Sequence, residues 1–357
     1  MQQQPIAITL GDAAGIGPEI IVKAFRQQPA LLRGCFVWGD VGSLRRACAQ
    51  LSGVPMPLAV IQAPQELWDL PPNCIAVLQE GEGLAPVALG QISAAAGAFA
   101  GRCVMAAARA ALSGSIGALV TAPLHKEALS AAGLPYSLYP GHTEMLQAIA
   151  AQHLGRPVCD LPVRMMLAND ELRTVLVSIH LSLREAIEAV TFEQVLQTLL
   201  ITHASLSRLL GRAPRIAVAG LNPHAGEGGL FGREELKIIA PAMQEAARQG
   251  CDVSGPWAPD TVFMRARKQA HQQSEFDVVV AMYHDQGLIP VKYLGVEKGV
   301  NVTLGLPLVR TSPDHGTAFD IAGQGRADPS SLLEAIRMAR ALAVETGNFP
   351  PGRPKEN

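Results

Sequence analysis

Short apolar runs alternate with longer helical patterns along almost the whole chain, and this alternation limits the possible folds more than any other feature. The apolar runs predict strands at residues 6–10, 35–38, 75–78, 117–121, 164–167, 174–178, 216–220 and 278–282. Helical periodicity predicts helices at residues 18–26, 43–51, 94–112, 144–152, 183–190, 192–209, 234–249 and 330–346. We therefore expect an α/β architecture with a largely parallel sheet.

Length and composition are typical of a folded protein of about two domains. The chain has 357 residues, of which 48% are hydrophobic and 17% charged, so a large core can form and disorder is not expected. The formal net charge is −2 and there is no basic block, which argues against broad nucleic-acid binding. The first residues lack a basic region followed by a long apolar run, so we expect no signal peptide and a cytoplasmic location.

Two further compositional features bear on location. The six cysteines are scattered without a CxxC pair, which favours free thiols in a reducing compartment over disulfides or a thiolate zinc site. Residues 92–122 are rich in Ala and Gly and carry Arg102 and Arg109. We interpret this stretch as a buried helix followed by a strand, with a transmembrane helix as the alternative. No membrane partner is expected.

Residues 282–326 concentrate polar side chains among glycines and prolines. This combination of residue types predicts a site for a small anionic substrate. Histidine can bind a metal ion, lysine and arginine can bind a phosphate, and glycines allow tight turns. Lys292, Asn301 and Arg310 recur at nine-residue intervals in sequence that we interpret as extended. Arginine offers a planar fork and lysine a point charge to a phosphate or carboxylate, and solvated surface charge is the alternative.

Three histidines each follow the C-terminal end of a predicted strand, namely His180, His224 and His284. In an open α/β sheet these strand ends line the ligand crevice. The three could converge on one divalent metal ion and leave a coordination position open for substrate. The alternative is that they are three unrelated polar loop residues.

The segment YPGHTEML opens a predicted helix with His142 and Thr143. His142 could face the same crevice while Thr143 caps the helix. The alternative is a plain helix N-cap, with Glu144 stabilising the positive end of the helix dipole.

Two glycine-rich segments are candidate nucleotide-binding loops. Residues 11–19 follow the first strand, but their spacing differs from G-x-G-x-x-G and no ribose-binding carboxylate is clear. Residues 312–329 are richer, and their backbone N–H groups with Asp320 could hold the sugar and phosphates of a nucleotide. A complicated structural turn is the alternative for this second segment.

Taken together, these motifs resemble the 4-hydroxythreonine-4-phosphate dehydrogenase (PdxA-like) family over almost the whole chain, with NPHAGEGG and YHDQG as the most specific segments. HGTAFDIAGQG and GDAAGIGPE also resemble loops of isopropylmalate and isocitrate dehydrogenases. The resemblance implies two α/β/α subdomains with a cleft between them. We expect one at residues 1–135 and 305–357, with the termini and the cofactor loop. The other, at residues 136–304, would hold the metal ligands and the dimer interface.

The resemblance also implies roles for individual residues, with active sites shared between the subunits of a homodimer. His180, His224 and His284 match metal ligands, with zinc expected before magnesium or cobalt. The positions that match substrate contacts are His142, Thr143, Lys292, Asn301, Arg310 and Asp260, the last reaching across the dimer. The positions that match the NAD-binding loop are Asp314, His315, Gly316, Thr317, Asp320 and Gly323. Asp285 and Lys292 are the candidates for the general acid and base.

The implied reaction is an NAD-dependent and metal-dependent oxidation and decarboxylation of a 4-phosphorylated hydroxy acid. Candidate substrates are 4-hydroxythreonine 4-phosphate and D-threonate or D-erythronate 4-phosphate, and GGLFGREE and AFDIAG favour the sugar acids. A cis-dihydrodiol dehydrogenase of the same family, a zinc-dependent sugar-phosphate lyase without NAD, and a non-catalytic sensor are the alternatives. Two departures from the family pattern are Ala13 in place of proline and a longer segment between Cys251 and His284.

Overall fold

The computed structural model describes residues 4–268 and 274–343. The end of the predicted helix 330–346 and the tail that follows it lie outside the described residues. The strands are β1 (Ile6–Thr9), β2 (Cys35–Gly39), β3 (Leu58–Ile61), β4 (Ile75–Gln79), β5 (Ala118–Thr121), β6 (Arg164–Ala168), β7 (Arg173–Leu176), β8 (Arg215–Ala219), β9 (Asp252–Trp257), β10 (Val278–Ala281), β11 (Val300–Leu304) and β12 (Arg310–Pro313).

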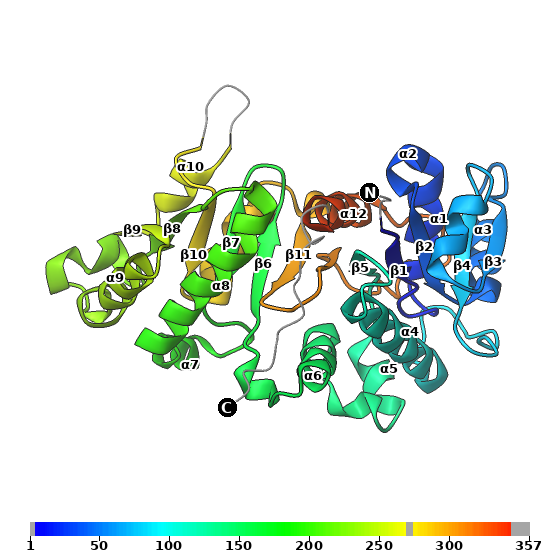
Figure 1. The fold of residues 1–357 in the computed structure, drawn as a ribbon, viewed down its shortest axis with the longest axis horizontal. Coiled ribbons are helices and arrows are strands. Elements are labelled where there is room, and N and C mark those ends of the chain that lie inside the picture. The colour runs from blue at the N-terminus through cyan, green and yellow to red at the C-terminus, as the bar shows by residue number, and fades with distance from the viewer. Residues whose placement is uncertain (1–3, 269–273, 344–357) are drawn as a thin grey trace, which may run out of the picture.

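Helices cover the sheet formed by these strands (Figure 1). The α-helices are α1 (Gly17–Gln27), α2 (Pro29–Leu32), α3 (Val41–Gln50), α4 (Ala94–Leu112), α5 (Lys126–Ala131), α6 (His142–Leu154), α7 (Leu183–Glu188), α8 (Phe192–Leu210), α9 (Ala240–Arg248), α10 (Val262–Ala266), α11 (His284–Tyr293) and α12 (Ser330–Ala343). The short helical turns are η1 (Pro64–Asp69), η2 (Tyr136–Leu138), η3 (Val158–Asp160), η4 (Pro223–Gly229), η5 (Glu235–Ile239) and η6 (Val296–Lys298).

The described strands form one twelve-stranded sheet in the order β3-β4-β2-β1-β5-β12-β11-β6-β7-β10-β8-β9, which confirms the predicted α/β class. Strands β1 to β5 make one half, and β6 to β10 make the other (Figure 1). Strand pairs are parallel within each half except for β6 with β7. In the middle, β11 runs antiparallel to both β12 and β6. Short connections explain the β6–β7 and β11–β12 pairs, because a short loop cannot cross back to start a parallel strand.

The interpretation of residues 282–326 as broken, extended sequence was wrong in part, because α11, β11 and β12 all lie within it. Lys292 therefore lies in a helix, whereas Asn301 and Arg310 lie on strands. Helix α11 contains Gly287 and Pro290, which hide its helical pattern. Strands β3 and β9 were also missed, and the predicted helix 234–249 is divided into η5 and α9.

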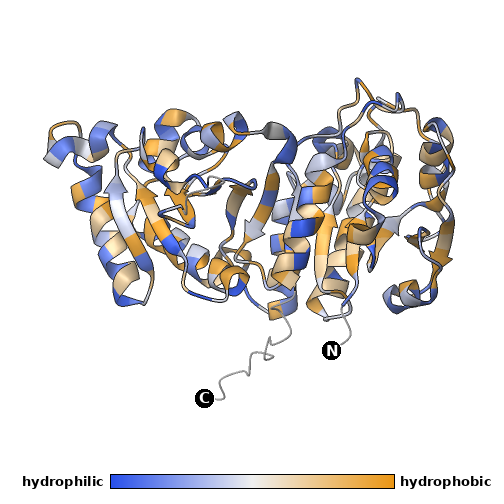
Figure 2. Ribbon diagram, turned by 90° about the horizontal axis from the view of Figure 1, so that it is seen from above, coloured by the Kyte–Doolittle hydropathy of each residue, from blue (hydrophilic) through white to orange (hydrophobic). Residues whose placement is uncertain are grey.

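Apolar side chains from both halves of the sheet form one continuous core cluster, which includes Ile8, Val120, Val302 and Val280. The strands in the interior are correspondingly hydrophobic (Figure 2). Helix α4 has the length and composition of a membrane span, but half of its apolar window is buried. It packs on α5, α6 and β5, so the buried-helix interpretation is confirmed.

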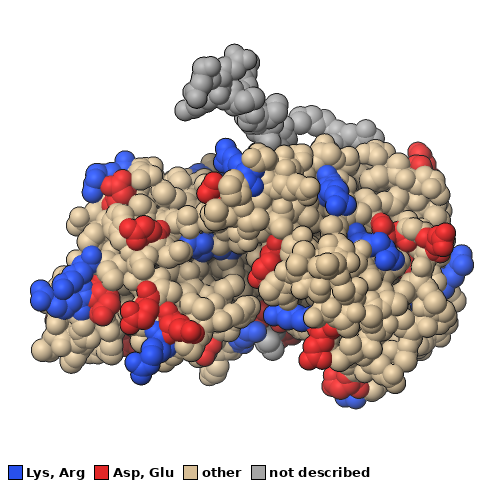
Figure 3. Space-filling model, turned by 90° about the horizontal axis from the view of Figure 1, so that it is seen from below, with Lys and Arg blue, Asp and Glu red and all other residues tan. Residues whose placement is uncertain are grey.

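The outer surface carries charges of both signs. On the face shown in Figure 3, acidic and basic side chains are interspersed. This distribution differs from the contiguous basic surface that broad nucleic-acid binding requires.

Candidate active site

The three histidines follow strands that are neighbours in the sheet. β10 pairs in parallel with β7 on one side and with β8 on the other, so the C-terminal ends of all three strands meet at one edge. His180 lies shortly after β7, His284 begins α11 directly after β10, and His224 lies in η4 after β8. The predicted placement at the strand ends is confirmed.

Two of the three imidazole rings face each other. The ring centroids of His180 and His284 are 5.7 Å apart, and both residues line one surface pocket with Tyr283 and Asp285. His224 lines an adjoining pocket with Asp260, which also contains Tyr283 and Asp285. Within residues 4–268 and 274–343, no three His, Cys, Asp or Glu side chains are close enough to bind one metal ion. A single chain thus brings two predicted ligands together and places the third beside them.

Carboxylates orient two of these histidines. Asp285 Oδ1 lies 2.7 Å from His284 Nδ1, and Glu227 Oε2 lies 3.3 Å from His224 Nδ1. A carboxylate on Nδ1 fixes the ring orientation and leaves Nε2 to bind a metal ion. Burial, followed by the charges of Lys126 and His284, lowers the pKa of His180, which favours the neutral imidazole that metal binding requires.

Arg310 is a buried cation at the start of β12. Its Nε and Nη2 atoms donate to Thr121 Oγ1 at 3.2 and 2.9 Å, and its Nη1 donates to Thr303 Oγ1 at 3.1 Å. Burial lowers its pKa to about 10, so it stays charged at neutral pH. Among the described residues no carboxylate lies within ion-pair distance of this guanidinium. The negative charge of Glu144 acts on it from beyond ion-pair distance and partly offsets the effect of burial on its pKa, so the guanidinium keeps spare N–H donors.

His142 lies in the electrostatic field of Arg310. Its Nε2 atom is buried and has no hydrogen-bond partner among the residues that the structure describes. Burial, followed by the charge of Arg310, lowers the pKa of His142 well below its usual value, so the ring is neutral. Helix α6 begins at His142 with Gly141 as its N-cap and without a side-chain cap. The interpretation of Thr143 as the helix cap is therefore wrong, because Thr143 already lies inside the first turn.

Lys292 and Asn301 were predicted to act with Arg310, but the contacts of these two side chains differ from those of Arg310. Lys292 Nζ at the end of α11 lies 2.7 Å from Asp314 Oδ2 at the end of β12. Asn301 is the second residue of β11, opposite Ser312 and Leu167, with a half-buried side chain. Lys292, Asn301 and Arg310 lie in three different elements, α11, β11 and β12. Their nine-residue spacing therefore does not arise from one helix or strand.

The two glycine-rich segments, which the sequence presents separately, pack into one unit. The Ile16 N–H donates to Thr317 O at 3.0 Å, and a Cβ on Gly15 would lie 2.9 Å from Thr317 Cβ. The buried Glu19 carboxylate accepts from Gly325 N at 3.2 Å and from Ala327 N at 2.8 Å. The late loop, with Asp314, His315, Gly316, Thr317, Asp320 and Gly323, therefore lies over the C-terminal end of β1.

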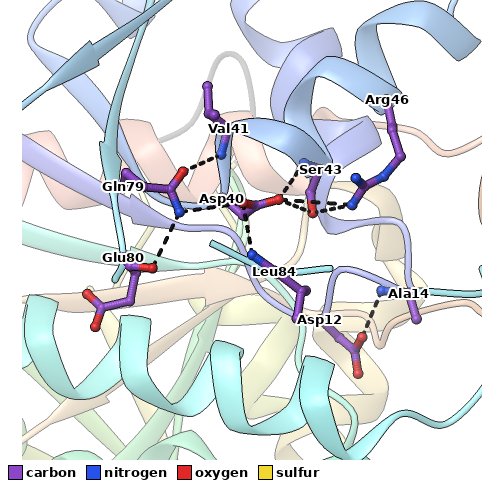
Figure 4. A network of polar contacts seen from close by, with 9 residues as sticks. All are labelled: Asp12, Ala14, Asp40, Val41, Ser43, Arg46, Gln79, Glu80 and Leu84. Atoms are coloured by element: carbon purple, nitrogen blue, oxygen red, sulfur yellow. Dashed lines mark hydrogen bonds and ion pairs between the residues drawn. The ribbon is translucent and has the colours of Figure 1, made fainter. Parts of the chain in front are cut away.

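The carboxylate of Asp40, which directly follows β2, accepts several hydrogen bonds within the protein (Figure 4). Asp40 accepts from Ser43 N at 2.6 Å, Ser43 Oγ at 2.8 Å and Leu84 N at 3.2 Å. Burial raises its pKa, but these hydrogen bonds outweigh burial and lower the pKa of Asp40 below its usual value. Because Asp40 caps α3 instead of facing the crevice, the first glycine turn lacks the ribose ligand of a dinucleotide fingerprint.

Two charged residues near the histidines, Lys126 and Glu144, were not among the predicted site residues. A Cβ on Gly141 would lie 3.5 Å from Glu144 Oε2 and 3.9 Å from Lys126 Cε, so both side chains lie beside the start of α6. Both charges act on the pKa of His180. The sequence did contain a signal for Lys126, because it follows β5 in the segment TAPLHKEAL.

Comparison with known proteins identifies the family. A family model described as "Pyridoxal phosphate biosynthetic protein PdxA" matches residues 32–339. The 4-hydroxythreonine-4-phosphate dehydrogenase of Beijerinckia indica subsp. indica is 50% identical over 350 residues, which cover 98% of each chain. The chain belongs to the PdxA family.

Other PdxA-family members show the same relationship. The D-threonate 4-phosphate dehydrogenase of Pectobacterium atrosepticum is 43% identical over 95% of this chain and 99% of its own. The crystal structure of 4-hydroxythreonine-4-phosphate dehydrogenase from Klebsiella pneumoniae has a TM-score of 0.83 at 41% identity, covering 96% of this chain and 98% of that one. This PdxA-family chain is therefore a dehydrogenase with the isocitrate/isopropylmalate dehydrogenase-like fold.

Proposed function

We propose that this dehydrogenase oxidises and decarboxylates a 4-phosphorylated hydroxy acid, with NAD as the hydride acceptor. The active site would also hold a divalent metal ion, for which zinc is the first candidate. Candidate substrates are 4-hydroxythreonine 4-phosphate, the substrate in the name of the 50% identical relative, and D-threonate or D-erythronate 4-phosphate. A reaction of this kind suits an enzyme of the cytoplasm.

The observation that best supports a phosphorylated acid as substrate is the arrangement of Arg310 and His142. A buried guanidinium without a carboxylate partner is costly unless an anion binds to it. Arg310 is such a group within the described part of the chain, and His142 adds a buried, unpartnered Nε2 atom in its field. The phosphate or carboxylate of a phosphorylated hydroxy acid supplies the missing charge and acceptors.

The histidine residues fit a metal ion shared between two protomers. The 5.7 Å separation of the His180 and His284 rings suits two imidazoles on one ion at Zn–N distances of about 2.0–2.1 Å. Large apolar side chains are exposed around both pockets, namely Leu181, Leu183, Ile187, Met264, Ile289 and Tyr293. Exposed apolar patches of this kind mark protein interfaces. A homodimer would cover them and bring His224 and Asp260 of one chain to the other chain's His180.

Each side chain has a task in this proposal. When bound, the metal ion lowers the pKa of the substrate hydroxyl and NAD accepts the hydride. Arg310, with Asn301, holds the substrate anion, and neutral His142 and Thr143 orient it. Asp285 fixes the His284 ring, and Lys292 joins the substrate side to the cofactor loop through Asp314. Lys126 joins Asp285 and Lys292 as a candidate proton donor for the product of decarboxylation.

A screen of NAD reduction tests the proposal. The purified protein is incubated with NAD and, in turn, 4-hydroxythreonine 4-phosphate, D-threonate 4-phosphate, D-erythronate 4-phosphate and a cis-dihydrodiol, with carbon dioxide release measured in parallel. We expect NADH and carbon dioxide from at least one phosphorylated acid. Oxidation of the dihydrodiol alone would replace this substrate class. Cleavage of a sugar phosphate without NADH would replace the dehydrogenase mechanism by a lyase.

A further inference from the structure

The turn that carries His224 has an unusual backbone. Residues 224–228 all have positive φ, including the non-glycine residues His224 at 52°, Ala225 at 53° and Glu227 at 43°. In this left-handed conformation the Cβ atom of an L-residue crowds the following carbonyl oxygen. Such strain persists only where neighbouring groups hold the backbone in place, and it is concentrated at functional sites.

The buried carboxylate of Glu235 contacts the chain directly before this turn. Its Oε1 accepts from Leu221 N at 2.8 Å and from Asn222 N at 2.7 Å, and its Oε2 accepts from Asn222 Nδ2 at 3.0 Å. The residue is 2% exposed. No lysine or arginine among the described residues forms an ion pair with it, so its contacts are with the strand–turn junction.

Two further features link Glu235 to the turn. A Cβ on Gly226 would lie only 2.7 Å from Glu235 Oε2, so the backbone of the turn fits closely against the carboxylate. Glu235 begins η5, a single π-helical turn at the start of the predicted helix 234–249. Single π-turns inside helices occur frequently at functional sites.

We propose that Glu235 is a positioning residue that holds the left-handed turn and thereby presents the His224 imidazole to a divalent metal ion. This inference rests on the proposed metal-dependent function and adds a residue that acts through His224. Glu227 completes the arrangement by contacting His224 Nδ1 from the far end of the turn.

Cobalt binding by the metal-free full chain tests this role, because Co²⁺ shows visible absorption bands that report its ligands. Loss of an outer partner of a metal ligand weakens metal binding by about 10- to 100-fold. We expect Glu235→Gln to weaken Co²⁺ binding by that factor and to alter the absorption bands. The amide keeps one acceptor oxygen but turns an N–H donor toward one of the groups that the carboxylate binds.

Two glycine variants form a matched pair if Glu235→Gln does not fold. Gly226 and Gly228 have φ values of 79° and 67°, so an alanine suffers similar backbone strain at either position. A Cβ on Gly226 collides with Glu235, whereas a Cβ on Gly228 meets nothing within 4 Å. We expect Gly226→Ala to weaken Co²⁺ binding at least tenfold more than Gly228→Ala.

His224→Ala separates failure of this inference from failure of the proposed function. If His224→Ala loses the Co²⁺ bands while Glu235→Gln and Gly226→Ala bind Co²⁺ like the parent protein, the positioning role is overturned and the metal site stands. If His224→Ala binds Co²⁺ unchanged, the metal assignment is overturned and the positioning role with it. Glu19→Gln, at another buried loop-capping glutamate in the other half of the sheet, controls for general destabilisation.

Discussion

The Nζ atom of Lys292 lies 2.7 Å from Oδ2 of Asp314. Lys292 lies in the last turn of α11, the helix that begins with His284, and Asp314 begins the loop proposed to bind NAD. A single ion pair therefore joins a residue proposed to contact substrate with a residue proposed to contact the cofactor. We therefore expect the two proposed binding events to be coupled, because a change in either residue would remove the ion pair.

We predict that Asp314→Asn lowers the affinity for NAD and for the phosphorylated acid together, each by about twofold to fivefold, which suits a partly exposed ion pair. Steady-state kinetics with each substrate varied in turn measures both effects. Asp170→Asn is the control, because Asp170 forms an exposed pair with Lys298 at 3.7 Å. A change in only one of the two affinities would contradict the proposed coupling.

The pH dependence of stability should report the buried His142. Its pKa in the folded protein lies well below the value of about 6.5 in an unfolded chain, so acid favours the unfolded state, which binds the proton. Its contribution to stability is complete above pH 6.5 or so and is lost as the pH falls from there toward the folded pKa. We expect the melting temperature of His142→Asn to fall less steeply than that of the parent protein between about pH 7 and pH 5. Parallel curves from thermal melts would show that His142 is not buried as described.

Lys126 should matter for turnover although we did not single it out from the sequence. Its side chain lies near that of Glu144 beside the start of α6, and its charge lowers the pKa of His180. We predict that Lys126→Ala lowers kcat by at least about 100-fold, the lower end of the range for removal of a proton-transfer group, while NAD binding stays unchanged. Glu127→Ala, at the neighbouring exposed position of α5, is the control. Equal activity of the two variants would remove Lys126 from the mechanism.

Removal of bound metal by a chelator should abolish turnover, and Zn²⁺ should restore it. We expect Asp285→Asn to weaken metal binding by about 10- to 100-fold, because the carboxylate lies 2.7 Å from His284 Nδ1 and orients that ring. Metal titrations of the chelator-treated protein, followed by activity and by calorimetry, measure both effects. Full activity after metal removal would falsify the metal-dependent mechanism.

The alternation of apolar runs and helical patterns predicted the α/β class and the positions of the three histidines at strand ends. Apolar strands such as β8 and β10 are buried on both faces and are therefore plain in the sequence. Strands β11 and β12, with sequences VNVTL and RTSP, carry polar side chains because they lie where the two halves of the sheet meet around the site. Their local composition resembles a loop, and only pairing with β5 and β6 makes them strands.

Sequence alone therefore determined the class of fold, the histidines at strand ends and the family that the motifs resemble, because these depend on local periodicity and on residue identity. Tertiary structure decided which of those residues face one another. It placed His180 opposite His284, left Arg310 buried without a carboxylate partner and joined the two glycine-rich loops through Glu19. Such contacts join residues more than a hundred positions apart, and only the path of the folded backbone brings them within a few ångströms.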